Sequence, residues 1–308
     1  MRKIAAIGEV LFDSYKGNEI LGGAPFNFIY HIHQINKQFN LGYETGFISK
    51  IGADARGEKI KFFFDEIGLP LQLLQTNDTY DTGVVHVKIN GFGTPEYEIV
   101  EQVAYDYIDF TPEIKTFISN DMAFLYFGTL FQRSGHNRKT LSKCLPEENI
   151  FHQKVFFDIN LRQNYFSWEV IDSSLLEADY LKVNQDELYL LRTKYFAEKQ
   201  FYYDKDFIDF LMEEYVLDAI IVTKGGKGAS IYMDEFNFWE HEGKFCYDLK
   251  DTVGAGDAFS AIFTLGTLLE WKGNKILDRA IDFSTEICKI KGAIPLDKDW
   301  YRQFKDWF

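Results

Sequence analysis

The sequence predicts an α/β domain whose mostly parallel central sheet is covered by helices on both faces. Short apolar runs typical of buried strands occur at residues 3–7, 124–127, 155–157, 180–183 and 219–222. Amphipathic stretches that fit helices follow or separate these runs, at residues 26–36, 57–67, 186–194 and 204–215. Because strands alternate with helices along the chain, parallel strand pairing is favoured.

Two segments depart from this alternation and predict extra strands at about residues 11–21 and 82–103. The second contains the alternating pattern Val85-His86-Val87-Lys88-Ile89, which is followed by the turn-forming string Gly91-Phe92-Gly93. Such strands could form a small lid over a ligand crevice or an edge extension of the main sheet. The chain has no internal repeat and no Pro/Ser-rich linker, so we expect a single domain over residues 1–308.

The charge balance argues against a nucleic-acid partner. The 308 residues carry a formal net charge of −14 and contain no Lys/Arg-rich run that could neutralise a phosphate backbone. No segment approaches the length of a membrane span, and the N-terminal apolar run reaches Glu9 too soon for a signal peptide. We therefore expect a cytoplasmic protein without a membrane partner.

The three cysteines, Cys144, Cys246 and Cys288, lie far apart in the sequence and form no C-x-x-C pair. This spacing argues against a disulfide framework and against a zinc site, and it predicts three buried thiols.

The strongest functional signal is the string Asp251-Thr252-Val253-Gly254-Ala255-Gly256-Asp257-Ala258-Phe259, which precedes an apolar, helix-compatible run. Small residues at 254–256 allow the backbone to approach a ligand closely. If a helix starts there, its unpaired N–H groups and its dipole create a site for an anion such as phosphate. Asp257 in the first turn could then accept the proton of an attacking hydroxyl group. A helix start with an acidic first turn and no ligand is the structural alternative.

The same string matches the D-T-x-G-A-G-D-x-F signature of the PfkB/ribokinase family of carbohydrate kinases, and the chain resembles that family along nearly its whole length. The resemblance implies a three-layer α/β/α ribokinase-like fold with a mostly parallel central sheet and a small β lid. It also implies that ATP, Mg²⁺ and K⁺ take part. The remaining matching elements, in family order, are Ile7-Gly8-Glu9-Val10 with Asp13, Gly22-Gly23-Ala24-Pro25-Phe26-Asn27, Gly46-Phe47-Ile48-Ser49-Lys50-Ile51-Gly52-Ala53-Asp54 with Gly57, Asp158-Ile159-Asn160-Leu161-Arg162 with Trp168, Lys182-Val183-Asn184-Gln185-Asp186-Glu187, Val222-Thr223-Lys224-Gly225-Gly226-Lys227-Gly228 and the stretch of residues 280–293, which resembles the family's adenine-side helix.

The resemblance assigns each candidate residue a role. Asp257 is the catalytic base, and Gly254, Ala255 and Gly256 form the anion hole. The sugar-binding residues are Asp13, Gly23, Asn27 and Arg162. The nucleotide-binding residues are Asn184, Thr223, Gly225, Gly228, Thr252, Gly254 and Gly256. Glu187 and Asn184 organise Mg²⁺ through water, and Asp251 with the carbonyl groups of residues 289–293 forms a monovalent cation site.

Several of these residues also have structural interpretations. Asp13 could be an ordinary loop carboxylate, and Asn184 with Glu187 could be a helix start without a ligand. For Asp54 we favour a structural role as a helix N-cap. His31 and His33 show no metal-ligand spacing, so we expect both to be structural.

The expected activity is transfer of the ATP γ-phosphoryl group to a free sugar, with D-fructose as the leading substrate. The elements Gly22-Gly23-Ala24-Pro25 and D-x-N-x-R resemble those of fructokinases. A kinase for 2-keto-3-deoxygluconate or a ribose-type sugar is the alternative, because Arg162 could bind a carboxylate. A non-catalytic sugar or nucleotide sensor on the same fold is a further alternative, since fold does not determine function. Exposed strand edges of the lid also suggest a homodimer.

Overall fold

The computed structural model describes residues 1–89, 95–119, 121–145, 153–195, 200–234 and 237–308. The strands in chain order are β1 (Lys3–Ile7), β2 (Leu11–Tyr15), β3 (Asn18–Gly22), β4 (Glu44–Gly52), β5 (Leu74–Asn77), β6 (Gly83–Ile89), β7 (Pro95–Ile99), β8 (Met122–Phe127), β9 (Lys154–Asp158), β10 (Tyr180–Asn184), β11 (Ala219–Thr223), β12 (Ala229–Tyr232) and β13 (Phe238–His241). The α-helices are α1 (Ala24–Phe39), α2 (Ala55–Ile67), α3 (Pro112–Ile118), α4 (Gly135–Cys144), α5 (Trp168–Glu177), α6 (Gln185–Tyr195), α7 (Asp204–Glu214), α8 (Ala255–Leu268) and α9 (Gly273–Ile287). Short 3₁₀ helices are η1 (Leu71–Leu73), η2 (Ala104–Tyr107), η3 (Leu130–Arg133), η4 (Gly225–Lys227) and η5 (Trp300–Phe304).

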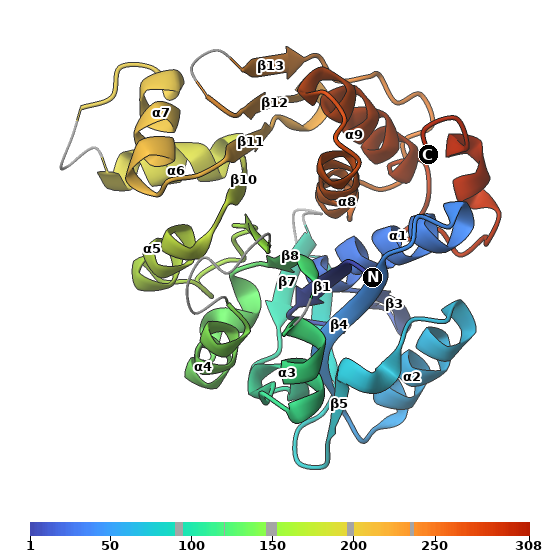
Figure 1. Cartoon of the computed structure of the whole chain (residues 1–308). Coiled ribbons are helices and arrows are strands. Elements are labelled where there is room, and N and C mark those ends of the chain that lie inside the picture. Colours follow the sequence, from blue (N-terminus) through green and yellow to red (C-terminus); the bar gives the residue numbers. More distant parts are fainter. Residues whose placement is uncertain (90–94, 120, 146–152, 196–199, 235–236) are drawn as a thin grey trace.

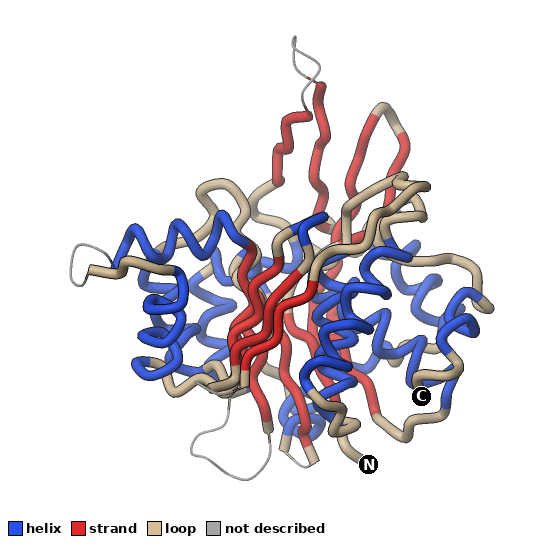
Figure 2. Tube along the Cα trace, turned by 90° about the horizontal axis from the view of Figure 1, so that it is seen from above, coloured by secondary structure: helices blue, strands red, loops and turns tan. Residues whose placement is uncertain are grey.

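Nine of the described strands form the central sheet, in the order β13-β12-β11-β10-β9-β8-β1-β4-β5. Neighbouring strands from β11 to β5 are parallel, and β12 and β13 add antiparallel strands at one edge. Figures 1 and 2 show this sheet between two layers of helices, with α1, α2, α8 and α9 on one face and α3 to α7 on the other. The predicted α/β/α architecture with a mostly parallel sheet is therefore confirmed.

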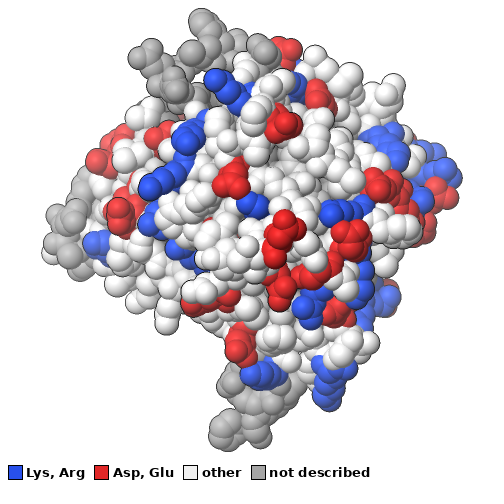
Figure 3. All heavy atoms as spheres, turned by 90° about the horizontal axis from the view of Figure 1, so that it is seen from below, with Lys and Arg blue, Asp and Glu red and all other residues white. Residues whose placement is uncertain are grey.

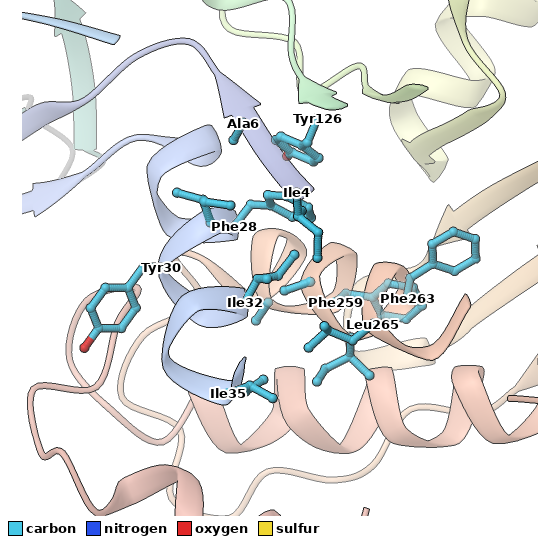
Figure 4. Packing of buried hydrophobic residues seen from close by; sticks show 14 of the residues in the cluster. Ile4, Ala6, Phe28, Tyr30, Ile32, Ile35, Tyr126, Phe259, Phe263 and Leu265 are labelled. Carbon is cyan, nitrogen blue, oxygen red and sulfur yellow. The ribbon is translucent and has the colours of Figure 1, made fainter. Parts of the chain in front are cut away.

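The two faces of the sheet carry separate hydrophobic clusters, because successive side chains of a strand point to opposite faces. In β1, Ile4 and Ala6 belong to the cluster that includes α1, α2, α8 and α9, whereas Ala5 and Ile7 belong to the cluster that includes α3 to α7. Figure 4 shows Ile4 and Ala6 beside Phe28 of α1. Helix α8 lies within the first cluster, and its residues 257–266 are all buried, so both its position and its direction are determined by packing.

Strands β2, β3, β6 and β7 form a separate four-stranded sheet in the order β3-β2-β6-β7. The pairs β2/β3 and β6/β7 are antiparallel, and β2 joins them through a parallel pairing with β6. Figure 2 shows this small sheet projecting from one end of the molecule. The alternative of an edge extension of the main sheet is therefore wrong, and the small β lid is confirmed. The predicted turn Gly91-Phe92-Gly93 lies outside the described residues.

Other local predictions can also be compared with the structure. His31 and His33 are buried and structural as expected: the His31 ring contacts Tyr301 Oη (2.8 Å) and Ala293 O (3.1 Å), and the His33 ring contacts Thr45 Oγ1 (2.8 Å). The cysteine prediction was only partly right. All three thiols are free, but only Cys144 is buried, while the other two are half-buried. Among the described residues, no helix is both long and apolar enough to cross a membrane.

Asp54 is the N-cap of α2, as the sequence predicted. Its Oδ1 accepts hydrogen bonds from Gly57 N (2.7 Å) and Thr82 Oγ1 (2.8 Å), and its Oδ2 accepts one from Thr82 N (2.7 Å). Burial raises the pKa of Asp54, but these hydrogen bonds outweigh burial, so the pKa lies below its usual value. One carboxylate therefore joins the start of α2 to the first residue before the lid strand β6.

We expect Asp54→Ala to lower the free energy of unfolding by about 2 kcal/mol, because it removes a cap and leaves the Thr82 N–H without its partner. Urea unfolding measures this, with Asp65→Ala on the exposed face of the same helix as the control. Because the folded pKa of Asp54 is lowered, its contribution is present above the unfolded pKa of about 4 and is lost as the pH falls through the folded pKa. The difference between wild type and variant should therefore shrink in acid. Equal stability at pH 7 would contradict the prediction.

Candidate active site

The candidate site lies where α8 begins, next to the carboxyl ends of the parallel strands β1, β9 and β10. This is the end of an open α/β sheet at which ligands usually bind. The chain as a whole is acidic, and Figure 3 shows basic and acidic side chains interspersed on the face in view. A triphosphate therefore has to be held by local groups rather than by the overall field.

The turn before α8 forms an open cradle of backbone N–H groups. Gly254 is the N-cap of α8 with a φ of 79°, and no side chain caps this helix end. Among the described residues, no hydrogen bond starts from the backbone N–H of Gly256 or Asp257, whereas Ala255 N makes only a long 3.4 Å bond to Thr252 O. Unpaired N–H groups at a helix N-terminus favour an anion. The three predicted anion-hole residues, Gly254, Ala255 and Gly256, therefore lie together at such a position.

The cradle is held in place by contacts that leave no room for side chains. A Cβ atom on Gly254 would lie 2.3 Å from Ala293 Cβ. Asp251 connects the loop before Gly254 to the neighbouring turn at Gly292 and Ala293. Its Oδ1 accepts a hydrogen bond from Val253 N and its Oδ2 accepts one from Gly292 N, both at 3.1 Å. Asp251, the predicted cation ligand, thus has a structural role in the described contacts.

Asp257 lies in the first turn of α8 and is only 8% exposed. Its Oδ2 accepts a 2.8 Å hydrogen bond from Asn27 Nδ2 on α1. Burial raises the pKa of Asp257 to about 6, and the negative charge of Asp158 adds to this rise. The Asn27 hydrogen bond and the positive charges of Lys182 and Arg162 oppose it. A carboxyl group with a pKa near neutrality, in the same turn as the N–H groups of Gly256 and Asp257, can accept a proton from a bound hydroxyl group.

The predicted sugar-binding residues come from three elements, of which α1 contacts Asp257 through Asn27. Asp13 is on the lid strand β2, close enough to Gly22 that a Cβ there would lie 3.3 Å from Asp13 Oδ2. Gly23 is the N-cap of α1, and Asn27 follows one turn later. Arg162 follows β9 and is exposed. Burial raises the pKa of both Asp13 and Asp257, and the charge of Arg162 opposes both rises, so the guanidinium group lies within electrostatic range of both carboxyl groups.

Glu9 is a candidate residue to which the sequence interpretation gave no role. It follows β1, is 4% exposed, and its Oε2 has no hydrogen-bond partner. Burial raises its pKa to about 7, and Arg162 and Asp257 both act on it electrostatically. Asn27 Oδ1 is a second buried acceptor without a partner. Among the eight buried side-chain atoms without a partner in the described residues, these two belong to residues that act on Asp257, Asn27 through its hydrogen bond and Glu9 through its charge. The signals for Glu9 in the sequence were its position at a strand end and its place in the family-matching element Ile7-Gly8-Glu9-Val10.

Asn184 and Glu187 form a reciprocal cap at the start of α6. Glu187 N donates to Asn184 Oδ1 (2.9 Å), while Glu187 Oε2 accepts from Asn184 N (2.8 Å) and Oε1 accepts from Leu161 N (2.8 Å). Both carboxylate oxygens are thus already in use, and burial raises the pKa of Glu187. Such a pair fits contact with Mg²⁺ through water and not direct coordination. Within the described residues, no group of three His, Cys, Asp or Glu side chains could hold a metal ion directly.

The predicted nucleotide-binding residues lie around the ends of β11 and β12 and in the loop before α8. Thr223 ends β11 and pairs in register with Asn184. Gly225 is the first residue of the short helix η4, and Gly228 is its C-cap, where a Cβ would lie 2.0 Å from His241 O. Thr252 is exposed in the loop before α8.

A cavity of about 570 Å³ lies elsewhere, and its lining includes Arg133, Arg138 and Tyr165 but none of the predicted site residues. Arg133 forms a buried ion pair with Asp106 (2.7 Å), so its charge is already compensated there.

Comparison with known proteins agrees with this architecture. A relative from Pyrococcus horikoshii, a putative sugar kinase, is 25% identical over 291 residues, which cover 89% of this chain and 85% of the relative. A fructokinase from Escherichia coli is 24% identical over 246 residues, covering 78% of this chain and 74% of that protein. The solved structure of a putative ribokinase II from E. coli in complex with ATP and Mg²⁺ superposes with a TM-score of 0.76 at 19% identity, covering 95% of this chain and 94% of that one. The model of the pfkB family carbohydrate kinases matches residues 17–299. The chain therefore belongs to the pfkB family of carbohydrate kinases, with the ribokinase-like fold of that family.

Proposed function

We propose that this chain transfers the γ-phosphoryl group of ATP to a hydroxyl group of a free sugar, with D-fructose as its leading substrate. The observation that carries the proposal is the geometry at the start of α8. A buried carboxyl group, Asp257, lies in the same turn as the uncapped N–H groups of residues 254–257. One turn of helix thus offers both a proton acceptor and a site for the charge of a transferring phosphoryl group.

The proposed reaction is an in-line displacement. Asp257 accepts the proton of the sugar hydroxyl group, whose oxygen attacks the γ-phosphorus while the bond to the β,γ-bridging oxygen breaks and ADP leaves. The N–H groups of the cradle stabilise the negative charge on the phosphoryl oxygens during transfer. When bound with ATP, Mg²⁺ would neutralise polyphosphate charge, with Asn184 and Glu187 holding water molecules of its shell. K⁺ near Asp251 is a further proposal, and it rests on the family resemblance.

The sugar would be held by Asp13, Gly23 and Asn27. The fructose assignment is supported by the resemblance of residues 22–25 and 158–162 to fructokinases and by the fructokinase among the relatives. The charge distribution also favours a neutral sugar, because three carboxyl groups, Glu9, Asp13 and Asp257, lie within electrostatic range of the single guanidinium group of Arg162. An acidic sugar such as 2-keto-3-deoxygluconate is the second candidate, since exposed Arg162 could bind its carboxylate in a bidentate manner.

A sugar panel tests the proposed activity. The purified chain with ATP and Mg²⁺ should release ADP rapidly only when a sugar is present. We expect the highest kcat/KM for fructose among fructose, ribose, tagatose and 2-keto-3-deoxygluconate. A preference of more than tenfold for the keto-deoxy acid, about 1.4 kcal/mol in transition-state binding, would assign the site to acidic sugars. Absence of sugar-dependent ADP release across the panel would favour a sensor.

Asp257→Asn should lower kcat by roughly two to four orders of magnitude, because the amide cannot accept the hydroxyl proton. The substitution keeps the size of the side chain, so ATP affinity measured by calorimetry should change little. In the wild type, kcat should fall as the pH drops below about 6, because the pKa of Asp257 is raised to about 6 and only the carboxylate form accepts a proton. Near-wild-type turnover by the variant with saturating substrates would remove Asp257 from this role.

Gly254→Ala should lower kcat far more than it weakens sugar binding, because the added methyl group collides with Ala293 and displaces the cradle. Gly42 provides a matched control: its φ of 78° is nearly that of Gly254 at 79°, but a Cβ on it would meet no atom within 4 Å. Both variants carry the backbone strain of about 1–3 kcal/mol expected for a side chain at such a φ. Only the Gly254 variant should lose phosphoryl transfer, and equal turnover in the two would contradict the cradle assignment.

A further inference from the structure

Beneath the first turn of α8, three neighbouring strands present polar side chains to one another. Asp158 on β9 and Lys182 on β10 are partners in the parallel ladder, so their side chains lie on the same face of the sheet. Asp158 Oδ2 accepts hydrogen bonds from Lys182 Nζ (2.7 Å), Tyr126 Oη on β8 (2.8 Å) and Ser260 Oγ on α8 (3.2 Å). One carboxylate oxygen thus joins three strands to the helix that carries Asp257.

This ion pair is almost completely removed from water. The side chains of Lys182 and Asp158 are 8% and 1% exposed. The attraction within a buried ion pair offsets little more than the free-energy cost of removing its two charges from water. Apolar residues of similar volume often give equal or greater stability. Stability alone is therefore a poor explanation for a lysine and an aspartate at this position.

The ammonium group of Lys182 lies against the cradle itself. A Cβ atom on Gly256 would be only 3.2 Å from Lys182 Nζ. The single hydroxyl hydrogen of Ser260 is shared between Asp158 Oδ2 and Gly256 O (3.0 Å), so Ser260 links the ion pair to the cradle. Because Gly256 has no side chain, the ammonium group of Lys182 can lie directly behind the N–H groups of the first turn.

We propose that Lys182 is a positioning residue for phosphoryl transfer: it places a fixed positive charge behind the first turn of α8, and Asp158 holds it there. The charge opposes the rise in the pKa of Asp257 that burial and Asp158 cause, and it adds to the positive potential of the cradle. This inference rests on the proposed function of Asp257 as proton acceptor. Neither Lys182 nor Asp158 is required to touch the substrate.

The signs of the charges around Asp257 determine in which direction each substitution should shift its pKa. The groups that face Asp257 are Glu9 after β1, Asn27 on α1, Asp158 and Arg162 at and after the end of β9, and Lys182 on β10. Burial and the charge of Asp158 raise the pKa of Asp257, whereas Lys182 lowers it. Burial lowers the pKa of Lys182, but Asp158 outweighs burial and raises it, so the ammonium group stays charged. Removal of Lys182 should therefore raise the pKa of Asp257, and removal of Asp158 should lower it.

The experiment is an NMR titration of the full chain labelled with ¹³C at the aspartate carboxyl carbons, with Asp257→Asn identifying the Asp257 resonance. Lys182→Met should move the titration midpoint of Asp257 up by roughly one pH unit, and Asp158→Asn should move it down by a similar amount. The double variant should return the midpoint to near the wild-type value. Because no substrate is present, the result is independent of which sugar, if any, is phosphorylated.

Lys154→Met is the matched control, since Lys154 lies at the opposite end of β9 and pairs with Asp179 there. It should leave the Asp257 midpoint unchanged. Thermal unfolding shows which variants are folded. If Lys182→Met does not fold, the proposal is tested by whether the titration midpoint of Asp257 moves down in Asp158→Asn. Midpoints that stay at the wild-type value in the folded variants, or that move in the same direction for both substitutions, would overturn the proposal. If the pH at which kcat falls in acid shifts between variants as the NMR midpoint of Asp257 does, the charge of Lys182 is connected to turnover.

Discussion

Close packing fixes the first turn of α8 in one position, and most of the candidate site depends on that position. Gly254 packs so closely against Ala293 that a methyl group would not fit there. Gly256 packs against Lys182, and a methyl group would fit there only tightly. The rest of α8 is buried between α1, α9 and the sheet, so the helix cannot slide to relieve either contact. The cradle is therefore rigid because of packing, and its N–H groups need no reorganisation when an anion arrives.

Placing Asp257 in this turn has an energetic cost. Asp257, Asp158, Lys182 and Glu9 are all nearly or fully buried, and each buried charge costs several kcal/mol unless it is paired. Asp158 is paired with Lys182, and Asp257 has one hydrogen bond from Asn27, but Glu9 Oε2 has no partner. Large apolar clusters on both sides of the sheet supply the compensating stability. Such uncompensated polar groups are typical of sites whose missing partner is the ligand.

Environment also shifts the pKa values of the carboxyl groups. Burial raises the pKa of Asp257 to about 6 and that of Glu9 to about 7, so both carboxyl groups hold a proton more readily than an exposed carboxyl group does. A protonated Glu9 can donate a hydrogen bond to a sugar oxygen, whereas ionised Asp257 can only accept one. Surroundings that shift the pKa values of neighbouring carboxyl groups by different amounts are typical of acid–base sites.

Local sequence patterns were sufficient where the structure is determined locally. Strand β1 was predicted to the residue, and the N-cap role of Asp54 followed from a short motif. Strand β4 was missed because buried Ser49 and Lys50 interrupt its apolar pattern, and their partners, Gly8 O and Asp109, are distant in sequence. The contiguous cradle residues could be proposed from one string. The role of Lys182 could not, since it depends on the register between β9 and β10 and on the closeness of Gly256.

The two sides of the site are held with different strength. The proposed phosphate cradle belongs to α8 and the sheet, whereas Asp13, a proposed sugar-binding residue, belongs to the lid strand β2. At its base the lid is fixed by the hydrogen bonds between Asp54 and Thr82. Farther out, Glu19 on β3 connects to α2 through ion pairs with Arg56 and Lys59, and the Lys59 side chain is 60% exposed. Exposed ion pairs contribute about 0–1 kcal/mol, so the outer lid is the more easily displaced part. Small movements there would change the position of Asp13 relative to Asp257 while leaving the cradle intact, so under the proposed roles the lid would affect sugar binding more than phosphoryl transfer.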